Sequence, residues 1–194
     1  MLTEPVAAKT HDEFHQLTSS IRTRGHLRRA AVEAVVVVVL MVGGGLLLWG
    51  GNFADNMVHD QLTDQRISFP QAGSEGFSAK EFPGLQQYAG QMVDNGPKAK
   101  AYADQYIATH IDQIGGGKTY SELSTESRAN PDDAALAGKV QTVFRGETLR
   151  GLLLYAWGWS VVGHIASLVA WGAFALAGVV LAALVYGMAR PQHA

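Results

Sequence analysis

Two apolar stretches restrict most strongly what this chain can fold into. The first, residues 30–51, reads AAVEAVVVVVLMVGGGLLLWGG and carries a single charged residue, Glu33. A helix rises 1.5 Å per residue, so about twenty such residues cross the roughly 30 Å hydrocarbon core of a bilayer. Residues 30–51 are therefore predicted to form a transmembrane helix.

Basic residues before this stretch predict its orientation. Residues 21–29 read IRTRGHLRR and place four arginines beside the predicted span. Arginine and lysine near a first span are retained on the cytoplasmic side. Residues 1–29 are therefore expected to form a cytoplasmic leader, and the chain is expected to lie in the plasma membrane. The long polar leader and long apolar run favour an uncleaved anchor over a signal peptide, whose apolar region has about 7–15 residues.

The second apolar stretch covers residues 152–188. Aromatic residues crowd its first part, and Tyr186 and Arg190 close its end, as at the two interfaces of a bilayer. We therefore place a second transmembrane helix at residues 160–188, with interfacial helical turns at 151–159 and a cytoplasmic tail at 189–194. The alternative is a hairpin that turns near Gly163 and His164 and leaves the carboxyl terminus outside.

The region between the spans, residues 52–150, has a different composition. It holds nine Lys or Arg and thirteen Asp or Glu, a net charge of −4, and few of the alternating runs that predict strands. We expect an extracytoplasmic helical domain here. The predicted fold class is all-α: two transmembrane helices with a helical extracytoplasmic domain inserted between them.

Several signals mark helices inside this region. Residues 85–93 are expected to be helical, and the run Asn-Gly-Pro at 95–97 predicts a new start, since Pro is well placed in a first helical turn. Apolar residues then recur at steps of three and four from 99 to 114, which predicts one strongly amphipathic helix. That apolar face is expected to pack against the chain that leaves the membrane.

Glycines 115–117 are expected to end this helix and reverse the chain. Thr119 with Glu122 three residues later is a capping-box pattern for a short helix. The run Asn-Pro-Asp-Asp at 130–133 predicts a further start, with Asn130 as the cap residue and acids at the positive end of the helix dipole.

The run GGGKT at 115–119 resembles part of a phosphate-binding loop. A P-loop needs a glycine five positions before the Gly-Lys pair and a strand before it, whereas this chain has Asp112 and a predicted helix there. A hinge between helices is the preferred interpretation, and no nucleotide is expected to bind. The net charge of −2 and the lack of a basic stripe also argue against nucleic acid.

Candidate metal ligands are His59, Asp60, Asp64 and His110, with Asp112 nearby in sequence. Asp60 and Asp64 lie one helical turn apart, but His110 could join them only if its helix packs there. The chain has no cysteine, which excludes thiolate ligands and nucleophiles. We predict no catalytic residue and no cofactor, and keep a membrane-bound metalloenzyme with a His/Asp site as the alternative.

Four further residues are candidates for interactions at or in the membrane: Glu33, Arg145, Arg150 and His164. Glu33 lies four residues after Arg29, close enough on a helix to share its charge. The two arginines are expected to contact lipid phosphate or acids of the outer region. His164 lies in the second apolar stretch, where a hydrogen bond to another helix or to headgroups is expected.

The run VDNGPKAKAYADQYIATHIDQIGGGKTYSELS, followed by FRGETLRGLLLYAWGW, resembles an uncharacterised family of actinobacterial integral membrane proteins. Some members are described as aromatic ring-opening dioxygenases, enzymes that hold iron with His and carboxylate ligands, and no such constellation stands out here. The resemblance implies a plasma-membrane protein with an external loop domain and adds no catalytic residue. We expect a non-enzymatic protein that interacts with the bilayer and with a membrane-protein partner or further copies of itself.

Overall fold

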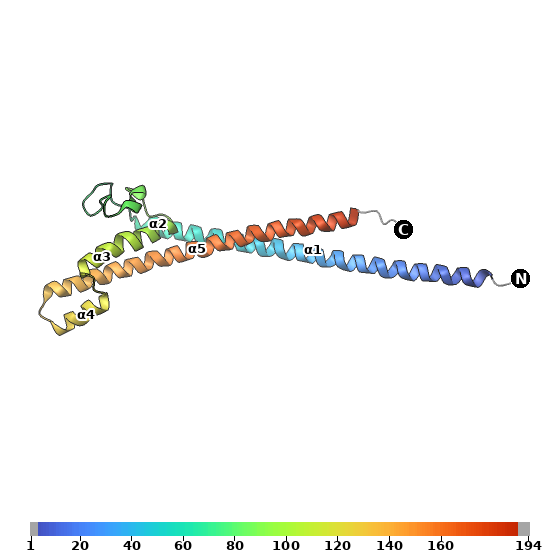
Figure 1. Cartoon of the computed structure of the whole chain (residues 1–194), viewed down its shortest axis with the longest axis horizontal. Coiled ribbons are helices and arrows are strands. Elements are labelled where there is room, and N and C mark those ends of the chain that lie inside the picture. The colour runs from blue at the N-terminus through green and yellow to red at the C-terminus, as the bar shows by residue number, and fades with distance from the viewer. Residues whose placement is uncertain (1–3, 190–194) are drawn as a thin grey trace. The chain divides into compact units, whose positions relative to one another are not determined.

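The structure, a computed structural model, describes the backbone of residues 4–189 and the side chains of residues 27–189. This part of the chain is helical, as predicted, and contains no strand beyond an isolated antiparallel bridge between Ser68 and Met92. The elements, which follow one another as in Figure 1, are α1 (Glu4–Gln65), η1 (Pro83–Tyr88), α2 (Gly96–Ala101), η2 (Tyr102–Ile107), α3 (Ala108–Gly115), α4 (Tyr120–Ala129) and α5 (Ala134–Ala189). The side chains of Arg22 and Arg24 and the tail at 190–194 lie outside the described residues.

Two of these helices are long and apolar enough to cross a membrane, namely α1 over Leu27–Gln65 and α5 over Ala134–Ala189. In their most apolar windows only 6% and 11% of the residues are buried, respectively. The core helix of a soluble protein would be mostly buried, so both helices have apolar surface without a protein partner among the described residues. The second apolar stretch is one continuous helix, which removes the hairpin alternative at Gly163 and His164.

The chain divides into two compact units, Met1–Leu48 with Leu168–Ala194, and Trp49–Ser167. In the first unit a small residue brings α1 and α5 together. Gly44 is buried, and a Cβ added to it would lie 2.7 Å from Cε1 of Phe174. Ala170 and Ala177 on α5 are buried as well. Small residues allow this close approach of two apolar helices.

The second unit begins with another close approach of the same two helices. A Cβ on Gly51 would lie 2.8 Å from the carbonyl oxygen of Gly163 and 2.4 Å from Oγ of Ser167. Ala54 is buried one turn further along α1. Only glycine at position 51 therefore permits this contact between the two backbones.

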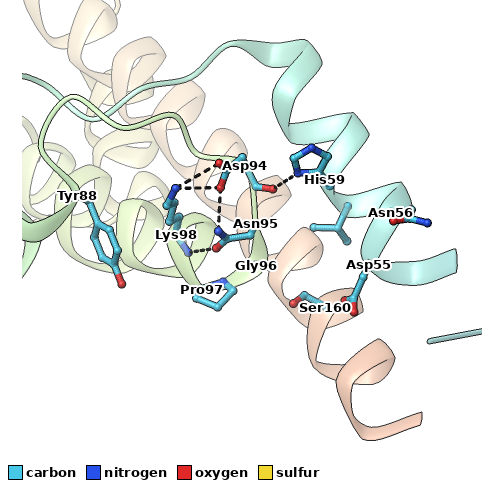
Figure 2. A pocket seen from close by; sticks show the side chains of 11 residues that line it. Asp55, Asn56, His59, Tyr88, Asp94, Asn95, Gly96, Pro97, Lys98 and Ser160 are labelled. Carbon is cyan, nitrogen blue, oxygen red and sulfur yellow. Dashed lines mark hydrogen bonds and ion pairs between the residues drawn. The ribbon is translucent and has the colours of Figure 1, made fainter. Parts of the chain in front are cut away.

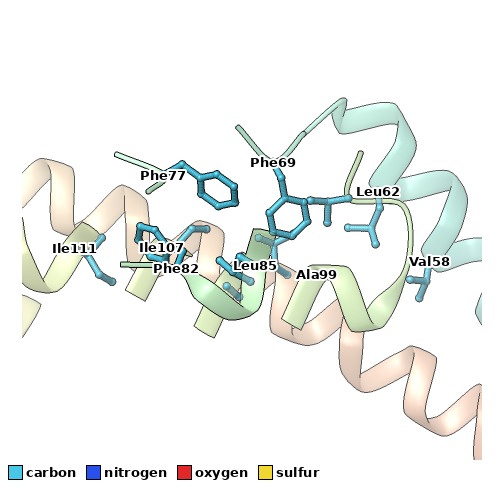
Figure 3. Close-up of a cluster of buried hydrophobic side chains, with 12 residues drawn as sticks. Val58, Leu62, Phe69, Phe77, Phe82, Leu85, Ala99, Ile107 and Ile111 are labelled. Carbon is cyan, nitrogen blue, oxygen red and sulfur yellow. The ribbon is translucent and has the colours of Figure 1, made fainter. Parts of the chain in front are cut away.

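The remainder of the second unit surrounds a hydrophobic core that the apolar face of the 99–114 segment helps to build, as predicted (Figure 3). Phe77, Leu85 and Val93 are fully buried in it. α1 contributes Val58 and Leu62, so the amphipathic helix does pack against the chain that follows the first apolar stretch. The cluster consists of Val58, Leu62, Phe69, Phe77, Phe82, Leu85, Val93, Ala99, Ala103, Ile107, Ile111 and Leu153.

The amphipathic helix is continuous through α2, η2 and α3, but its middle is wider than an α-helix. Asn95 caps it, because the Asn95 side chain accepts a hydrogen bond from the Lys98 N–H at 3.0 Å, and Pro97 lies in the first turn. The backbone N–H of Ala108 donates to the carbonyl of Ala103, five residues back. This π-helical turn accommodates an extra residue, and the apolar spacing in the sequence did not predict it.

Two predicted helix boundaries are wrong. Residues 85–93 are helical only as far as Tyr88, where η1 ends. The following residues instead pair with the segment after α1: the Val93 N–H donates to the Ile67 carbonyl at 2.8 Å, and the Phe69 N–H to the Gln91 carbonyl at 2.9 Å. These backbone pairs replace the helical hydrogen bonds that residues 89–93 would otherwise form.

The start predicted at Asn130 lies at Asp133 instead. The side-chain amide of Asn130 donates to the Glu126 carbonyl at 2.9 Å and so closes α4. The carboxylate of Asp133 accepts from the Leu136 N–H at 2.9 Å and caps α5. An amide can donate to the free carbonyls at a helix end, whereas a carboxylate can only accept and suits a helix start.

The glycine run does end the amphipathic helix as predicted. Gly116 and Gly117 have φ angles of 64° and 77°, in the left-handed region that favours glycine. The capping box is present as well: the Thr119 side chain accepts from the Glu122 N–H, and the Glu122 carboxylate accepts from the Thr119 N–H at 2.8 Å. The run GGGKT is therefore a hinge between α3 and α4.

Candidate functional site

A cavity in the Trp49–Ser167 unit, larger than a second one near α4, has a volume of about 570 Å³ (Figure 2). Three parts of the chain meet around it: α1, the start of α2 with the residues before it, and α5. Asp55 and His59 lie one helical turn apart on α1, and Ser160 comes from α5. The lining consists of Asp55, Asn56, Val58, His59, Tyr88, Asp94, Asn95, Gly96, Pro97, Lys98 and Ser160.

The N-terminal cap of α2 forms one wall of this cavity. Asp94 accepts from the Lys98 ammonium at 3.0 and 3.3 Å and from the Asn95 amide at 2.8 Å. Gly96 lets α5 approach, because a Cβ there would lie 2.4 Å from Oγ of Ser160. The wall is therefore ordered by hydrogen bonds that belong to the start of the helix.

The four candidate metal ligands, His59, Asp60, Asp64 and His110, are not brought together. Within residues 27–189, no group of three or more His, Asp or Glu is arranged to hold a metal ion. The His59 ring hydrogen-bonds through Nδ1 to the Asp94 carbonyl at 2.9 Å, whereas His110 hydrogen-bonds to the Tyr106 carbonyl at 2.8 Å and stacks on Phe82. Asp60 and Asp64 are exposed on α1.

Arg150, predicted to contact lipid or acids, belongs to a charged network between η2 and α5. It donates to Asp104 at 3.3 Å and to Glu147 at 3.5 Å, and Lys100 also pairs with Asp104. The hydrogen bond from Lys100 lowers the pKa of Asp104 below its ordinary 3.8; burial opposes this shift, and the hydrogen bond from Arg150 adds to it. The Lys100 ammonium also lies 4.6 Å from the centre of the Trp157 ring, within the range of a cation–π contact.

The other three predicted interaction residues have different environments. Glu33 accepts from Arg29 Nε at 2.7 Å, as their spacing predicted. The side chains of Arg145 and His164 are exposed, and neither forms a hydrogen bond or ion pair with another described residue. His164 thus contacts no second helix through a hydrogen bond in this part of the chain.

Residues 117–119 of the hinge line the smaller cavity, of about 290 Å³. Lys118 is paired with Glu126 at 2.5 Å, and the Thr119 hydroxyl is used by the capping box. Asp112 and Glu147 also line this cavity. Its positive groups therefore already face carboxylates, which is unfavourable for a phosphate.

Two tyrosines in the aromatic part of the core have raised pKa values. Burial, reinforced by nearby Tyr106, raises the pKa of Tyr102 to about 12, and burial also raises the pKa of Tyr106. Their rings lie 4.9 Å apart. Both phenols therefore stay protonated near neutral pH, and neither is suited to act as a general base.

Sequence reasoning missed most residues of the larger cavity, including Asp55, Asp94, Lys98 and Ser160. The four-residue step from Asp55 to His59 is the local signal that could have identified part of it. Ser160, about a hundred residues further along the chain, offers no such signal. No protein-family model matches this chain, and no curated protein or solved structure matches it either.

Proposed function

We propose that this protein is a non-enzymatic component of the plasma membrane that crosses the bilayer twice, with an outer helical domain that binds another membrane protein. The two long apolar helices, largely unburied, support the membrane part of the proposal. The arginines before the first span favour cytoplasmic termini, so residues 52–150 would face outward. This arrangement agrees with the resemblance to actinobacterial integral membrane proteins with an external loop domain.

The observation that carries the binding role is an exposed aromatic pair in the proposed outer domain. The rings of Tyr120 on α4 and Phe144 on α5 lie 5.4 Å apart, and the side chains are 41% and 48% exposed. Ile114 adds a third exposed apolar side chain from α3. Aromatic residues are enriched in the centres of protein interfaces, and a paired aromatic surface without a cover favours a protein partner.

Cysteine labelling tests the orientation of the chain in the membrane. The sequence contains no cysteine, so only an introduced cysteine can react with the label. Ser74→Cys lies in the loop before η1, and Ser20→Cys lies in the leader. We expect a membrane-impermeant maleimide to label Ser74→Cys on intact cells and Ser20→Cys only after the cells are opened. Labelling of Ser20→Cys on intact cells would overturn the orientation.

Purification from gently solubilised membranes tests the binding role. We expect the wild-type chain to elute with a mass above that of one protomer, and mass spectrometry then distinguishes a second copy from a different membrane protein. Phe144→Ser should reduce this association, while Met92→Ser, which removes another exposed apolar side chain of the outer region, should not. A solitary protomer in every mild detergent would refute the proposal.

A further inference from the structure

The larger cavity contains one cation, and that cation is already neutralised. The Lys98 ammonium lies 3.0 and 3.3 Å from the two carboxylate oxygens of Asp94. Its side chain is only 16% exposed, so solvent screens this pair less than it would a surface pair. An anionic ligand would have to compete with Asp94 for Lys98, which makes the cavity a poor site for an anion.

Asp55, in contrast, places a negatively charged carboxylate at the cavity, and this carboxylate has no partner among the described residues. Its carboxylate forms no hydrogen bond or ion pair with any described residue. One carboxylate oxygen leans over the backbone of α5, since a Cβ on Gly163 would lie 3.1 Å from it. Figure 2 shows the Asp55 side chain beside Ser160. An exposed carboxylate at the edge of a cavity is available for a positively charged ligand.

His59 also lines the cavity, one helical turn after Asp55 on α1. A carbonyl oxygen can only accept, so Nδ1 of His59 carries the proton that it shares with the Asp94 carbonyl at 2.9 Å. His59 therefore lines the cavity on the side of Asp94, whereas Asp55 lies on the side of Ser160 (Figure 2).

We propose that this cavity binds a primary ammonium group, with the Asp55 carboxylate as its counter-ion and the Ser160 hydroxyl as a further acceptor. The two carboxylate oxygens and the hydroxyl oxygen can accept the three N–H donors of an ammonium. Tyr88 lines the opposite side of the cavity from Asp55 (Figure 2). The volume of about 570 Å³ is in the usual range for small-molecule sites and exceeds what the ammonium alone needs.

The amine has two possible sources: the ethanolamine headgroup of a phospholipid, or a free aliphatic amine. Ser160 is the first residue of the second predicted span, and Asp55 follows the first span by four residues. The cavity would therefore lie at the outer surface of the bilayer. This choice of source rests on the proposed function, whereas binding of the amine itself does not.

The test is calorimetric titration of the full chain, solubilised in a non-ionic detergent, with ethanolamine. Asp55→Asn keeps the shape of the side chain and removes its charge, and should lower the affinity by about fivefold, as for loss of a partly exposed ion pair. Asp60→Asn is the matched control, because it makes the same charge change on α1 at an exposed residue outside the cavity. It should leave the affinity unchanged. Both variants should keep the wild-type unfolding temperature.

Three results would overturn the proposal: no saturable binding of ethanolamine to the wild-type chain, equal affinities of the wild-type chain and Asp55→Asn, or an equal loss in Asp60→Asn. Tighter binding of inorganic phosphate than of ethanolamine would also overturn it. Because this titration is done in detergent, a failure of the proposed orientation would not affect it.

A second arm distinguishes the sources. The chain is placed in nanodiscs that contain phosphatidylglycerol, with or without phosphatidylethanolamine, and ethanolamine binding is measured again. Competition by phosphatidylethanolamine in the wild-type chain, absent in Asp55→Asn, identifies the lipid headgroup as the ligand. Unchanged ethanolamine binding in both kinds of nanodisc supports a free amine.

Discussion

Arg150 on α5 donates from Nη2 to Oδ1 of Asp104 on η2 at 3.3 Å. This hydrogen bond joins two helices through residues that lie 46 positions apart in sequence. The same arginine donates to Glu147 at 3.5 Å, and its Nε is buried without an acceptor among the described residues. Asp104 also pairs with Lys100. One carboxylate thus serves two cations from different elements.

Removal of that carboxylate should loosen the contact between η2 and α5. Asp104→Asn leaves Lys100 and Arg150 without their shared anion. The Asp104 and Arg150 side chains are 30% and 34% exposed, so we expect a loss of about 1 kcal/mol in the free energy of unfolding, or a decrease of roughly 2–4 °C in Tm. Thermal unfolding followed by tryptophan fluorescence measures it. Glu147→Gln, on the longer and more exposed contact, is the control and should change Tm by less than half as much.

Acid should destabilise the outer helices in a defined pH range. Hydrogen bonds to Asp104 from Lys100, and to Glu122 from the Thr119 N–H, lower both pKa values below the ordinary 3.8 and 4.5. A lowered carboxylate pKa contributes stability that is complete above the ordinary value and is lost as the pH falls through the lowered one. Tm should therefore be nearly constant from about pH 7 to 5 and decrease below about pH 4. Asp104→Asn should show a smaller acid decrease, and identical pH profiles would contradict the role of Asp104.

Two glycines on α5 should respond in opposite directions to the same substitution. A Cβ at Gly146 would lie 2.3 Å from Cγ2 of Ile111, whereas a Cβ at Gly138 would meet nothing within 4 Å. Gly138→Ala should stabilise the helix by up to about 1 kcal/mol. Gly146→Ala should destabilise the protein by about 1–3 kcal/mol, because Ile111 is held in the core. Chemical unfolding of both variants measures the difference, and stabilisation by both would show that α3 does not pack on α5 as described.

A similar pair tests the close approach of α1 and α5. Gly51→Ala would place a methyl group against the carbonyl of Gly163, and Gly50→Ala would meet open space. Backbone cannot move aside as a flexible side chain can, so Gly51→Ala should cost about 1–3 kcal/mol. An SDS titration should show that Gly51→Ala unfolds at a lower fraction of SDS than Gly50→Ala. Equal midpoints would contradict the contact.

Lys118→Ala should leave fold and partner binding almost unchanged. Lys118 pairs with Glu126, and the two side chains are 49% and 42% exposed, so the pair contributes about 0–1 kcal/mol. Tm and association in mild detergent provide the two measurements. A large loss of association in a folded variant would show that the lysine has a binding role and is more than a hinge residue.

Local signals in the sequence predicted much of the fold. The helix start at residues 95–97, the glycine hinge and the Thr119 capping box depend on residues within one turn of each other, and all three are confirmed. The runs of apolar residues predicted the two long helices for the same reason. The start at Asn130 was wrong because the run 130–133 contains two capping residues, and their order along the chain does not determine which one ends a helix and which begins the next.

Features that depend on contacts distant in sequence could not be predicted. Residues 89–93 pair with the segment after α1 instead of forming a helix, and the cavity needs Ser160 to meet the start of α2. An ion pair of Arg150 with acids was one of two alternatives, beside contact with lipid phosphate, but its particular partner, Asp104, depends on how η2 packs on α5. Neither the spacing nor the charge of these residues indicates which elements will meet.

The wide turn at Tyr102–Ile107 has a consequence for the phase of the helix. Ala99, Ala103, Ile107 and Ile111 are each four residues apart, and all four are buried. In a regular α-helix of 3.6 residues per turn, a four-residue repeat drifts around the axis by about 40° at each step. The π-helical turn contains more than four residues, so each residue in it advances by a smaller angle, and this offsets part of the drift. Deletion of a single residue there would leave a hydrogen-bonded helix whose second half is rotated out of register with the core.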